Sequence, residues 1–224
     1  MTPSDRFDLY DIEFRSLGQE KSRRTVFYFA LSAHDTLTIP SINMGAQYLA
    51  SHGVQVISPT LIFHEENEKP KDIQNLWSHE ILAYERHQNR LLEAISKLAR
   101  ESEHVGFMGL SRGGFVASHL FAKLPNIKAL TAFAPLTFLR NQDPWNVSLL
   151  DFHSRPARFY VGHRDTLVHT AQVMDAHASI VDRDAVARKT SSFDLVVKPS
   201  IGMQGHGTSP ATFLEGAQWL LENL

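Results

Sequence analysis

The run GLSRG at residues 109–113 places Ser111 between two glycines, a spacing that can support nucleophilic catalysis. An apolar stretch at 104–108 precedes it and a mostly apolar stretch at 115–124 follows it. This order predicts a buried strand, a sharp turn and a buried helix, which together form a nucleophile elbow. Strand and helix would approach too closely at the two glycines to leave room for a Cβ atom. The same pattern fits an ordinary turn in which Ser111 caps the helix, but the flanking strand and helix favour the elbow.

A serine hydroxyl needs a base to accept its proton and a third group to orient that base. After an elbow these partners follow in the order acid, then histidine. His206 is the predicted base, because it lies between two glycines after the last apolar stretch of the chain. Asp165 is the predicted acid, because it follows the preceding apolar stretch; its alternative role is to cap the next helix. Asp143 is the competing acid, but the following Pro144 suits a turn better.

Acyl transfer through a serine also needs N–H donors for the developing oxyanion. The backbone N–H of Arg112, directly after the predicted nucleophile, is one expected donor. The other should come from the loop after the apolar stretch at 25–31, where we expect Ala33, with His34 as the next candidate.

The elements that must position these residues alternate between strands and helices along the chain. This alternation predicts an α/β fold with a mainly parallel, doubly wound sheet of about seven strands in one domain over residues 1–224. Ligands bind at the carboxyl ends of strands in such sheets, and each candidate residue follows a predicted strand. The predicted strands are 7–15, 25–31, 54–58, 104–108, 129–134, 157–161 and 193–197, and the predicted helices are 41–52, 73–100, 115–124, 168–180 and one that starts at Pro210.

Composition excludes several other classes of protein. The formal net charge of the 224 residues is −2 with no basic stripe, so we expect neither a nucleic acid nor a membrane as partner. The absence of cysteine excludes disulfides, a thiolate nucleophile and cysteine metal sites. The polar start of the sequence and the lack of a long apolar run predict a cytoplasmic protein.

The elbow, Asp165 and His206 together resemble the α/β-hydrolase superfamily. The runs GLSRGG at 109–114, GHRDTLV at 162–168 and GHGT at 205–208 look like its dienelactone-hydrolase-like and prolyl-oligopeptidase-like branches. The resemblance extends from the strand at Thr25 to the last helix. It implies a triad of Ser111, Asp165 and His206, and neither a metal nor an organic cofactor. The chain is short and lacks the long insertion that forms a lid in many lipases, so we expect no large lid. The sequence departs from the family in two places: the expected oxyanion loop, LSA at 31–33, has no glycine, and only one early strand is evident where the family usually has two.

These features predict a serine hydrolase that forms an acyl-enzyme and cleaves a small carboxylic ester or thioester. A hydrolase of short peptides or aminoacyl substrates with the same triad is the alternative. A non-catalytic binding protein with this fold is an alternative of another class. A metal hydrolase is a third, and its candidate ligands are His34, Asp35, His163 and Asp165, although no dense ligand motif is present.

The segment 135–156 occupies the position where relatives carry a cap. Its Phe138, Trp145 and Phe152 could line an apolar substrate pocket or could pack this segment onto the sheet. His34 is a further candidate for substrate contact, and Arg140 could bind a substrate carboxylate. The charged loop 61–71 could form a small flap over the site.

Overall fold

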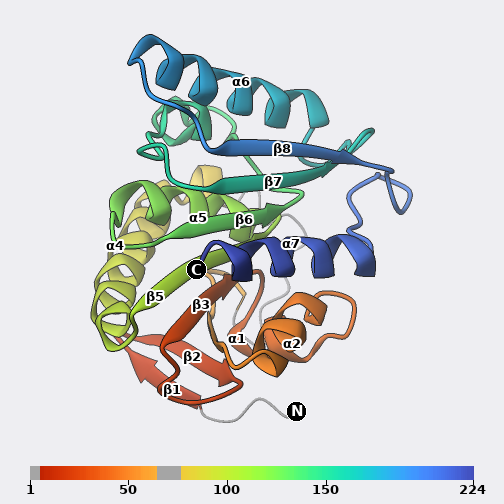
Figure 1. The fold of residues 1–224 in the computed structure, drawn as a ribbon. Coiled ribbons are helices and arrows are strands. Elements are labelled where there is room, and N and C mark those ends of the chain that lie inside the picture. The colour runs from red at the N-terminus through yellow and green to blue at the C-terminus, as the bar shows by residue number, and fades with distance from the viewer. Residues whose placement is uncertain (1–5, 65–76) are drawn as a thin grey trace.

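A computed structural model describes residues 6–64 and 77–224, which form an α/β structure around one eight-stranded sheet (Figure 1). The strand order is β1-β2-β4-β3-β5-β6-β7-β8; the first two strands are antiparallel to their neighbours and the other six run parallel. The strands are β1 (Arg6–Leu9), β2 (Ile12–Leu17), β3 (Arg24–Phe29), β4 (Gln55–Pro59), β5 (His104–Leu110), β6 (Ala129–Phe133), β7 (Ala157–Gly162) and β8 (Phe193–Lys198).

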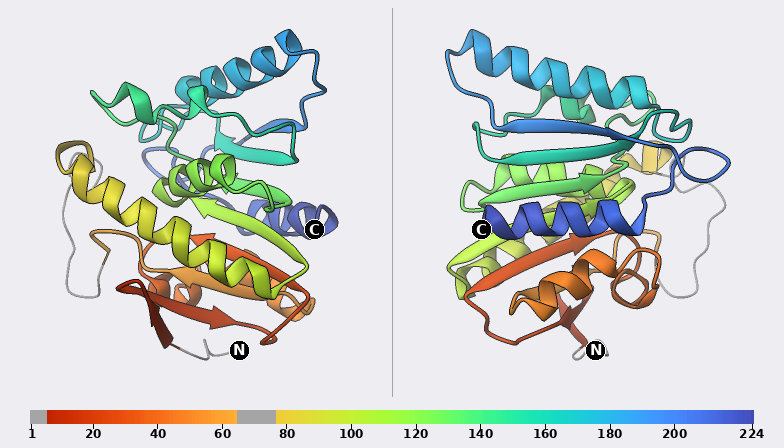
Figure 2. Two further views of the ribbon diagram at one scale, coloured as in Figure 1. Left: turned by 90° about the vertical axis from the view of Figure 1, so that its left-hand side faces the viewer. Right: turned by 45° about the vertical axis from the view of Figure 1, so that its right-hand side comes forward.

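Helices cover both faces of the sheet (Figure 2). They are α1 (Ala33–Thr38), α2 (Met44–Ser51), α4 (Ile81–Leu98), α5 (Arg112–Lys123), α6 (Thr170–Val186) and α7 (Pro210–Glu222). Helices α2 and α7 pack on one face, and α4, α5 and α6 pack on the other. Strand β3 shows the consequence, since Tyr28 faces the α2 side while Phe27 and Phe29 face the α5 side. Burial on both faces explains the uninterrupted apolar run at residues 26–29.

The early part of the chain corrects the prediction of a single edge strand at 7–15 and of about seven strands in all. Residues 6–17 form a hairpin, in which the turn residues Tyr10 and Asp11 adopt φ angles of 54° and 58°. Neither turn residue is glycine or asparagine, so the sequence carries no strong hairpin signal there. The second of the two early strands that the family usually has is therefore present.

The structure also differs from the predicted helices. The stretch after β3, expected to be a loop, contains α1, and the side chain of Ser32 caps this helix by accepting the Asp35 N–H at 3.0 Å. Helix α6 extends to Val186, beyond the predicted end at residue 180. The start of the predicted helix 73–100 and most of the predicted flap lie outside the described residues. Within residues 6–64 and 77–224, no helix has the length and apolar character needed to cross a membrane.

Candidate active site

Ser111 occupies a strained turn between β5 and α5. Its φ and ψ angles are 54° and −117°, a conformation that non-glycine residues rarely adopt. The backbone of neighbouring chain segments holds it there: Ser111 N–H donates to Phe133 O at 2.9 Å, and Ser111 O accepts the Leu136 N–H at 3.0 Å. These contacts tie the turn to the end of β6.

The glycines of the elbow are required by close backbone approach. A Cβ atom on Gly109 would lie 2.6 Å from Gly114 Cα, where the strand passes the start of α5. A Cβ atom on Gly113 would lie only 1.8 Å from Phe29 O in β3. Both distances are below any normal contact, so the turn can form only with glycine at these two positions.

The structure brings Ser111, His206 and Asp165 together in one hydrogen-bonded chain. His206 Nε2 lies 2.9 Å from Ser111 Oγ, and His206 Nδ1 lies 2.8 Å from Asp165 Oδ2. The three residues follow β5, β8 and β7, whose carboxyl ends lie at the same edge of the sheet. Asp143, the competing acid, is exposed in a short 3-10 turn at 143–145, whereas Asp165 is the carboxylate that contacts His206.

The environment of Asp165 keeps its carboxyl group ionised. Its side chain is completely buried, which by itself raises the pKa. The hydrogen bond from His206 and those from the N–H groups of Val168 and Leu167, at 3.0 and 2.9 Å, outweigh this effect, so the pKa of Asp165 lies below its usual value. An ionised Asp165 favours the tautomer of His206 that carries its proton on Nδ1 and leaves Nε2 free to accept one.

Polar contacts lock the loop of Asp165 to the loop of His206. Thr166 N–H donates to Gln204 O at 2.8 Å, and Arg164 N–H donates to Ser200 Oγ at 2.7 Å. The residue after Gln204, Gly205, has a φ angle of +71°, and a Cβ atom there would lie 2.2 Å from Arg164 O. These contacts hold the loop that carries His206 in place against the loop that carries Asp165.

Thr170 supports the loop of Asp165 from the start of α6. Its hydroxyl accepts the Asp165 N–H at 2.9 Å and donates to Gly162 O at 2.6 Å. Sequence analysis identified neither Thr170 nor the contacts of Ser200 and Gln204, because isolated polar residues in loops carry no periodic or motif signal.

The two expected oxyanion donors differ in their surroundings. Arg112 N–H is the first amide of α5, where no acceptor exists within the helix. Ala33 N–H instead donates to Thr60 Oγ1 at 2.9 Å, at the end of β4. The structure thus gives the Ala33 amide a partner inside the protein, which no local sequence pattern could indicate.

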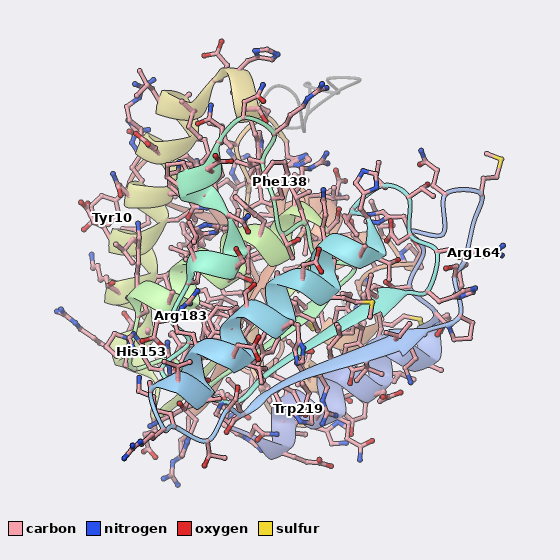
Figure 3. All side chains as sticks on the ribbon, turned by 90° about the horizontal axis from the view of Figure 1, so that it is seen from above. Tyr10, Phe138, His153, Arg164, Arg183 and Trp219 are labelled. Carbon is pink, nitrogen blue, oxygen red and sulfur yellow. The ribbon has the colours of Figure 1, made fainter. Side chains whose placement is uncertain are left out.

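The predicted substrate-contacting residues lie in different environments. Trp145 packs into an aromatic cluster, with its ring 4.9 Å from that of Tyr84 and 5.2 Å from that of His119. Phe138, labelled in Figure 3, is half-buried. It borders a cavity of about 250 Å³ between the 137–148 segment and α6. The side chain of Phe152 is almost completely buried in the core. Trp145 and Phe152 therefore pack this segment onto the protein.

The remaining two candidates differ in how far they are exposed. His34 is half-buried in α1, and its Nδ1 atom has no hydrogen-bond partner among the described residues. Arg140 is exposed.

The four candidate metal ligands do not form one cluster. His163 Nδ1 accepts the Ser200 N–H at 3.1 Å, and Asp165 is bonded to His206. Across the part of the chain that the structure describes, no three His, Asp or Glu side chains lie close enough together to hold a metal ion.

Comparison with known proteins places the chain in a family. The model of the dienelactone hydrolase family matches residues 36–191, well over half of the chain. No curated protein sequence matches the chain.

Solved structures show the same fold at low sequence identity. A dienelactone hydrolase from Anabaena variabilis has a TM-score of 0.69 at 18% identity, with both chains covered completely. TT1662 from Thermus thermophilus has a TM-score of 0.71 at 16% identity, covering 99% of this chain and 98% of the other. XC6422 from Xanthomonas campestris, described as a serine hydrolase without a lid, has a TM-score of 0.64 at 15% identity, covering 99% and 95%. The chain belongs to the dienelactone hydrolase family and is an α/β hydrolase that acts on ester bonds.

Proposed function

We propose that this protein is a serine esterase whose catalytic triad is Ser111, His206 and Asp165. The observation that carries the proposal is the continuous hydrogen-bond chain from Ser111 Oγ through both ring nitrogens of His206 to Asp165. It joins three residues from three different loops, and one of them, Ser111, lies in a strained turn. A helix cap or a simple turn does not require such an arrangement.

In the first half-reaction, His206 Nε2 accepts the hydroxyl proton while Ser111 Oγ attacks the carbonyl carbon of the ester. Asp165 holds the Nδ1–H of His206 and stabilises the imidazolium. The tetrahedral intermediate then collapses: the bond to the alcohol oxygen breaks, and the alcohol leaves with the proton from His206. In the second half-reaction, water attacks the acyl-enzyme with His206 as base, releasing the acid and free Ser111.

The Arg112 amide supplies one oxyanion donor in this mechanism. The second is the Ala33 amide, with His34 as the next candidate. For Ala33 to serve, its hydrogen bond to Thr60 Oγ1 must be exchanged for one to the oxyanion as the intermediate forms.

The proposed substrate is a small carboxylic ester or thioester, because no large lid is seen in the described part of the chain to enclose a long acyl chain. A peptide or aminoacyl substrate would use the same triad. The assembled triad favours catalysis over a pure binding role. The absence of a metal or organic cofactor and a cytoplasmic location stay predictions from the sequence.

Steady-state hydrolysis tests this function. Short-chain p-nitrophenyl esters, a thioester and an aminoacyl amide are offered to the wild type, to Ser111→Ala and to Ser179→Ala, whose serine is exposed on α6. We expect ester or thioester turnover in the wild type and in Ser179→Ala, and a loss of about 10³-fold or more in Ser111→Ala. Wild-type rates in Ser111→Ala would disprove the assignment of the nucleophile, and a preference for the amide would favour the peptidase alternative.

A further inference from the structure

The polar cavity between the 137–148 segment and α6 takes no part in the mechanism above. Its volume is about 250 Å³, and the exposed side chain of Asp175 on its wall shows that it is open to solvent. Figure 3 shows the segment, in which Phe138 is labelled, alongside α6. Pockets for drug-sized ligands span about 300–1,000 Å³, so this cavity suits a small ligand or one part of a larger ligand.

The wall of the cavity carries hydrogen-bonding groups that the described part of the chain leaves unused. There the carboxylate of Asp175 forms no ion pair or hydrogen bond, and the side-chain amide of Gln172 forms no hydrogen bond. Asn146 accepts the Ser148 N–H with its Oδ1 atom at 3.0 Å, which leaves its Nδ2 group free to donate. The ring of Phe138 adds an apolar surface.

Hydrogen bonds hold the two walls of the cavity together. Arg183 of α6 donates to Leu150 O at 2.6 Å and also to Ser148 O. Within the segment, Val147 N–H donates to Thr137 O at 2.9 Å. A cavity whose walls are fixed in this way needs little reordering when a ligand binds.

The composition of the wall selects the class of ligand. Among the described residues that line the cavity, Asp175 is the only charged one, so an anion would be repelled. An organic ammonium ion would pair with Asp175, but it carries only donors and could not accept a hydrogen bond from Asn146. A neutral hydroxylated ring can satisfy every group, because each hydroxyl both donates and accepts, and its C–H groups can pack against Phe138. These are the properties of a saccharide.

The cavity lies beside the loops that carry the proposed triad. The residue directly before Thr137 donates its N–H to Ser111 O at 3.0 Å, and Thr137 lines the cavity. On the other wall, Gln172 follows by two positions Thr170, whose hydroxyl accepts the Asp165 N–H. Consecutive Cα atoms are about 3.8 Å apart, so both walls begin close to the triad loops. A ring in the cavity can therefore belong to a substrate whose ester group lies at Ser111.

We propose, building on the esterase function above, that this cavity is a subsite for a saccharide ring of the substrate. The preferred substrates are then carboxylic esters of sugars, and the alcohol that leaves in the first half-reaction is a sugar hydroxyl. The subsite binds a part of the substrate that does not react, so its loss should raise KM and leave kcat nearly unchanged.

The kinetic test compares ethyl acetate with two saccharide acetates, 6-O-acetylglucose and monoacetylated xylobiose. The wild type should show a lower KM for at least one saccharide acetate than for ethyl acetate. Gln172→Ala should raise that KM by about 3- to 10-fold, the range expected for one hydrogen bond, and should leave the hydrolysis of ethyl acetate unchanged. The matched control on α6 is Asp182→Asn, which changes an exposed acid outside the cavity and should have no effect.

Three results would overturn the proposal. The first is a KM in the wild type that is no lower for either saccharide acetate than for ethyl acetate. The second is an equal rise in KM for saccharide and ethyl acetates in Gln172→Ala, which would mean a structural role. The third is a loss in Asp175→Asn without any loss in Gln172→Ala, which would indicate a site for cations.

Binding of free sugars to Ser111→Ala separates this inference from the esterase function. Methyl β-D-glucopyranoside and xylobiose are titrated and followed by saturation-transfer NMR, with tetramethylammonium as the cationic probe. We expect at least one sugar to bind, and to bind about 3- to 10-fold more weakly when Gln172→Ala is added. If a sugar binds in this way but the wild type cleaves no ester, the esterase function fails and the saccharide site stands. If neither sugar binds, if Gln172→Ala has no effect, or if only tetramethylammonium binds, the saccharide site is refuted even when esters are hydrolysed.

Discussion

At the scale of single residues, the lowered pKa of Asp165 makes the stability of the protein depend on pH. Burial favours the protonated form of its carboxyl group, but three hydrogen bonds favour the ionised form. The hydrogen bonds have the larger effect, so the pKa of Asp165 is lowered. A group whose pKa is lowered by folding stabilises the protein above its unfolded pKa, near 4, and this contribution is lost as the pH falls through the lower folded value.

Asp165→Asn should therefore change both activity and stability. Without the carboxylate, His206 can adopt the wrong tautomer, so we expect kcat to fall by about 10³- to 10⁴-fold, as it does for the equivalent change in a serine protease. The variant should also be less stable than the wild type at pH 7, and the gap should narrow below about pH 4. Urea unfolding at both pH values measures the gap, with the exposed Asp143→Asn as control; a gap independent of pH would contradict the proposed ionisation.

At the scale of elements, the elbow depends on the contact between the start of α5 and β3. In Gly113→Ala the new Cβ atom would meet Phe29 O at 1.8 Å, a backbone atom that cannot rotate away. We expect a loss of about 3 kcal/mol or more in the free energy of unfolding, and a loss of activity. Gly53→Ala is the control: Gly53 also has a positive φ, +76°, but its Cβ would meet nothing within 4 Å. That control should cost about 1 kcal/mol, and equal effects of both substitutions would argue against the steric explanation.

The other end of α5 is held by Arg155. Its guanidinium donates to Leu124 O and Ile127 O at 2.7 and 2.8 Å, donates also to Phe121 O, and lies 3.8 Å from the centre of the Phe121 ring. These bonds satisfy carbonyl groups at and beyond the end of the helix.

Arg155→Met should lower the free energy of unfolding by about 2–4 kcal/mol, because several buried carbonyl groups lose their donor. Arg155→Lys should not restore it, since an ammonium group cannot reach several acceptors in a plane. Chemical denaturation measures both variants beside Arg23→Met, which removes an exposed ion pair with Glu103. Little change is expected in that control, and an equally small change in Arg155→Met would refute the anchoring role.

At the scale of the whole molecule, buried neutral histidines make folding sensitive to acid. Burial lowers the pKa of His119, on α5, to about 4, although its hydrogen bond to Phe115 O acts in the opposite direction. The unfolded chain binds a proton near pH 6.5 and the folded chain only near pH 4. Stability is therefore complete above pH 6.5 and falls as the pH drops toward 4.

The variant His119→Phe should reduce the slope of stability against pH in this window by about 1.4 kcal/mol per pH unit. Denaturant midpoints recorded between pH 4 and 7 give the slope, and the exposed His79→Gln serves as control. A slope that matches the wild type would mean that folding does not lower the pKa of His119.

Sequence analysis succeeded where local geometry restricts residue type. The elbow needs glycine at 109 and 113, so the sequence marks it clearly. A parallel sheet places the carboxyl ends of its strands at one edge, so the loops of Asp165 and His206 could be predicted to lie near Ser111. The family assignment and ester-bond hydrolysis are likewise confirmed.

The parts that could not be predicted depend on contacts distant in sequence. The bond from Ala33 to Thr60 spans 27 positions and involves residue types that occur in any loop. The turn at Tyr10 and Asp11 lacks the glycine that marks most tight hairpins, so the sequence predicts one long strand there.

The central claim, that Ser111 is an activated nucleophile, is tested most directly by intact-mass spectrometry after treatment with a fluorophosphonate. The account predicts a single adduct on the wild type, none on Ser111→Ala, and slow labelling of His206→Ala, because the serine then has no base. A folded wild-type protein that takes up no adduct, or a Ser111→Ala variant labelled as fast as the wild type, would contradict it.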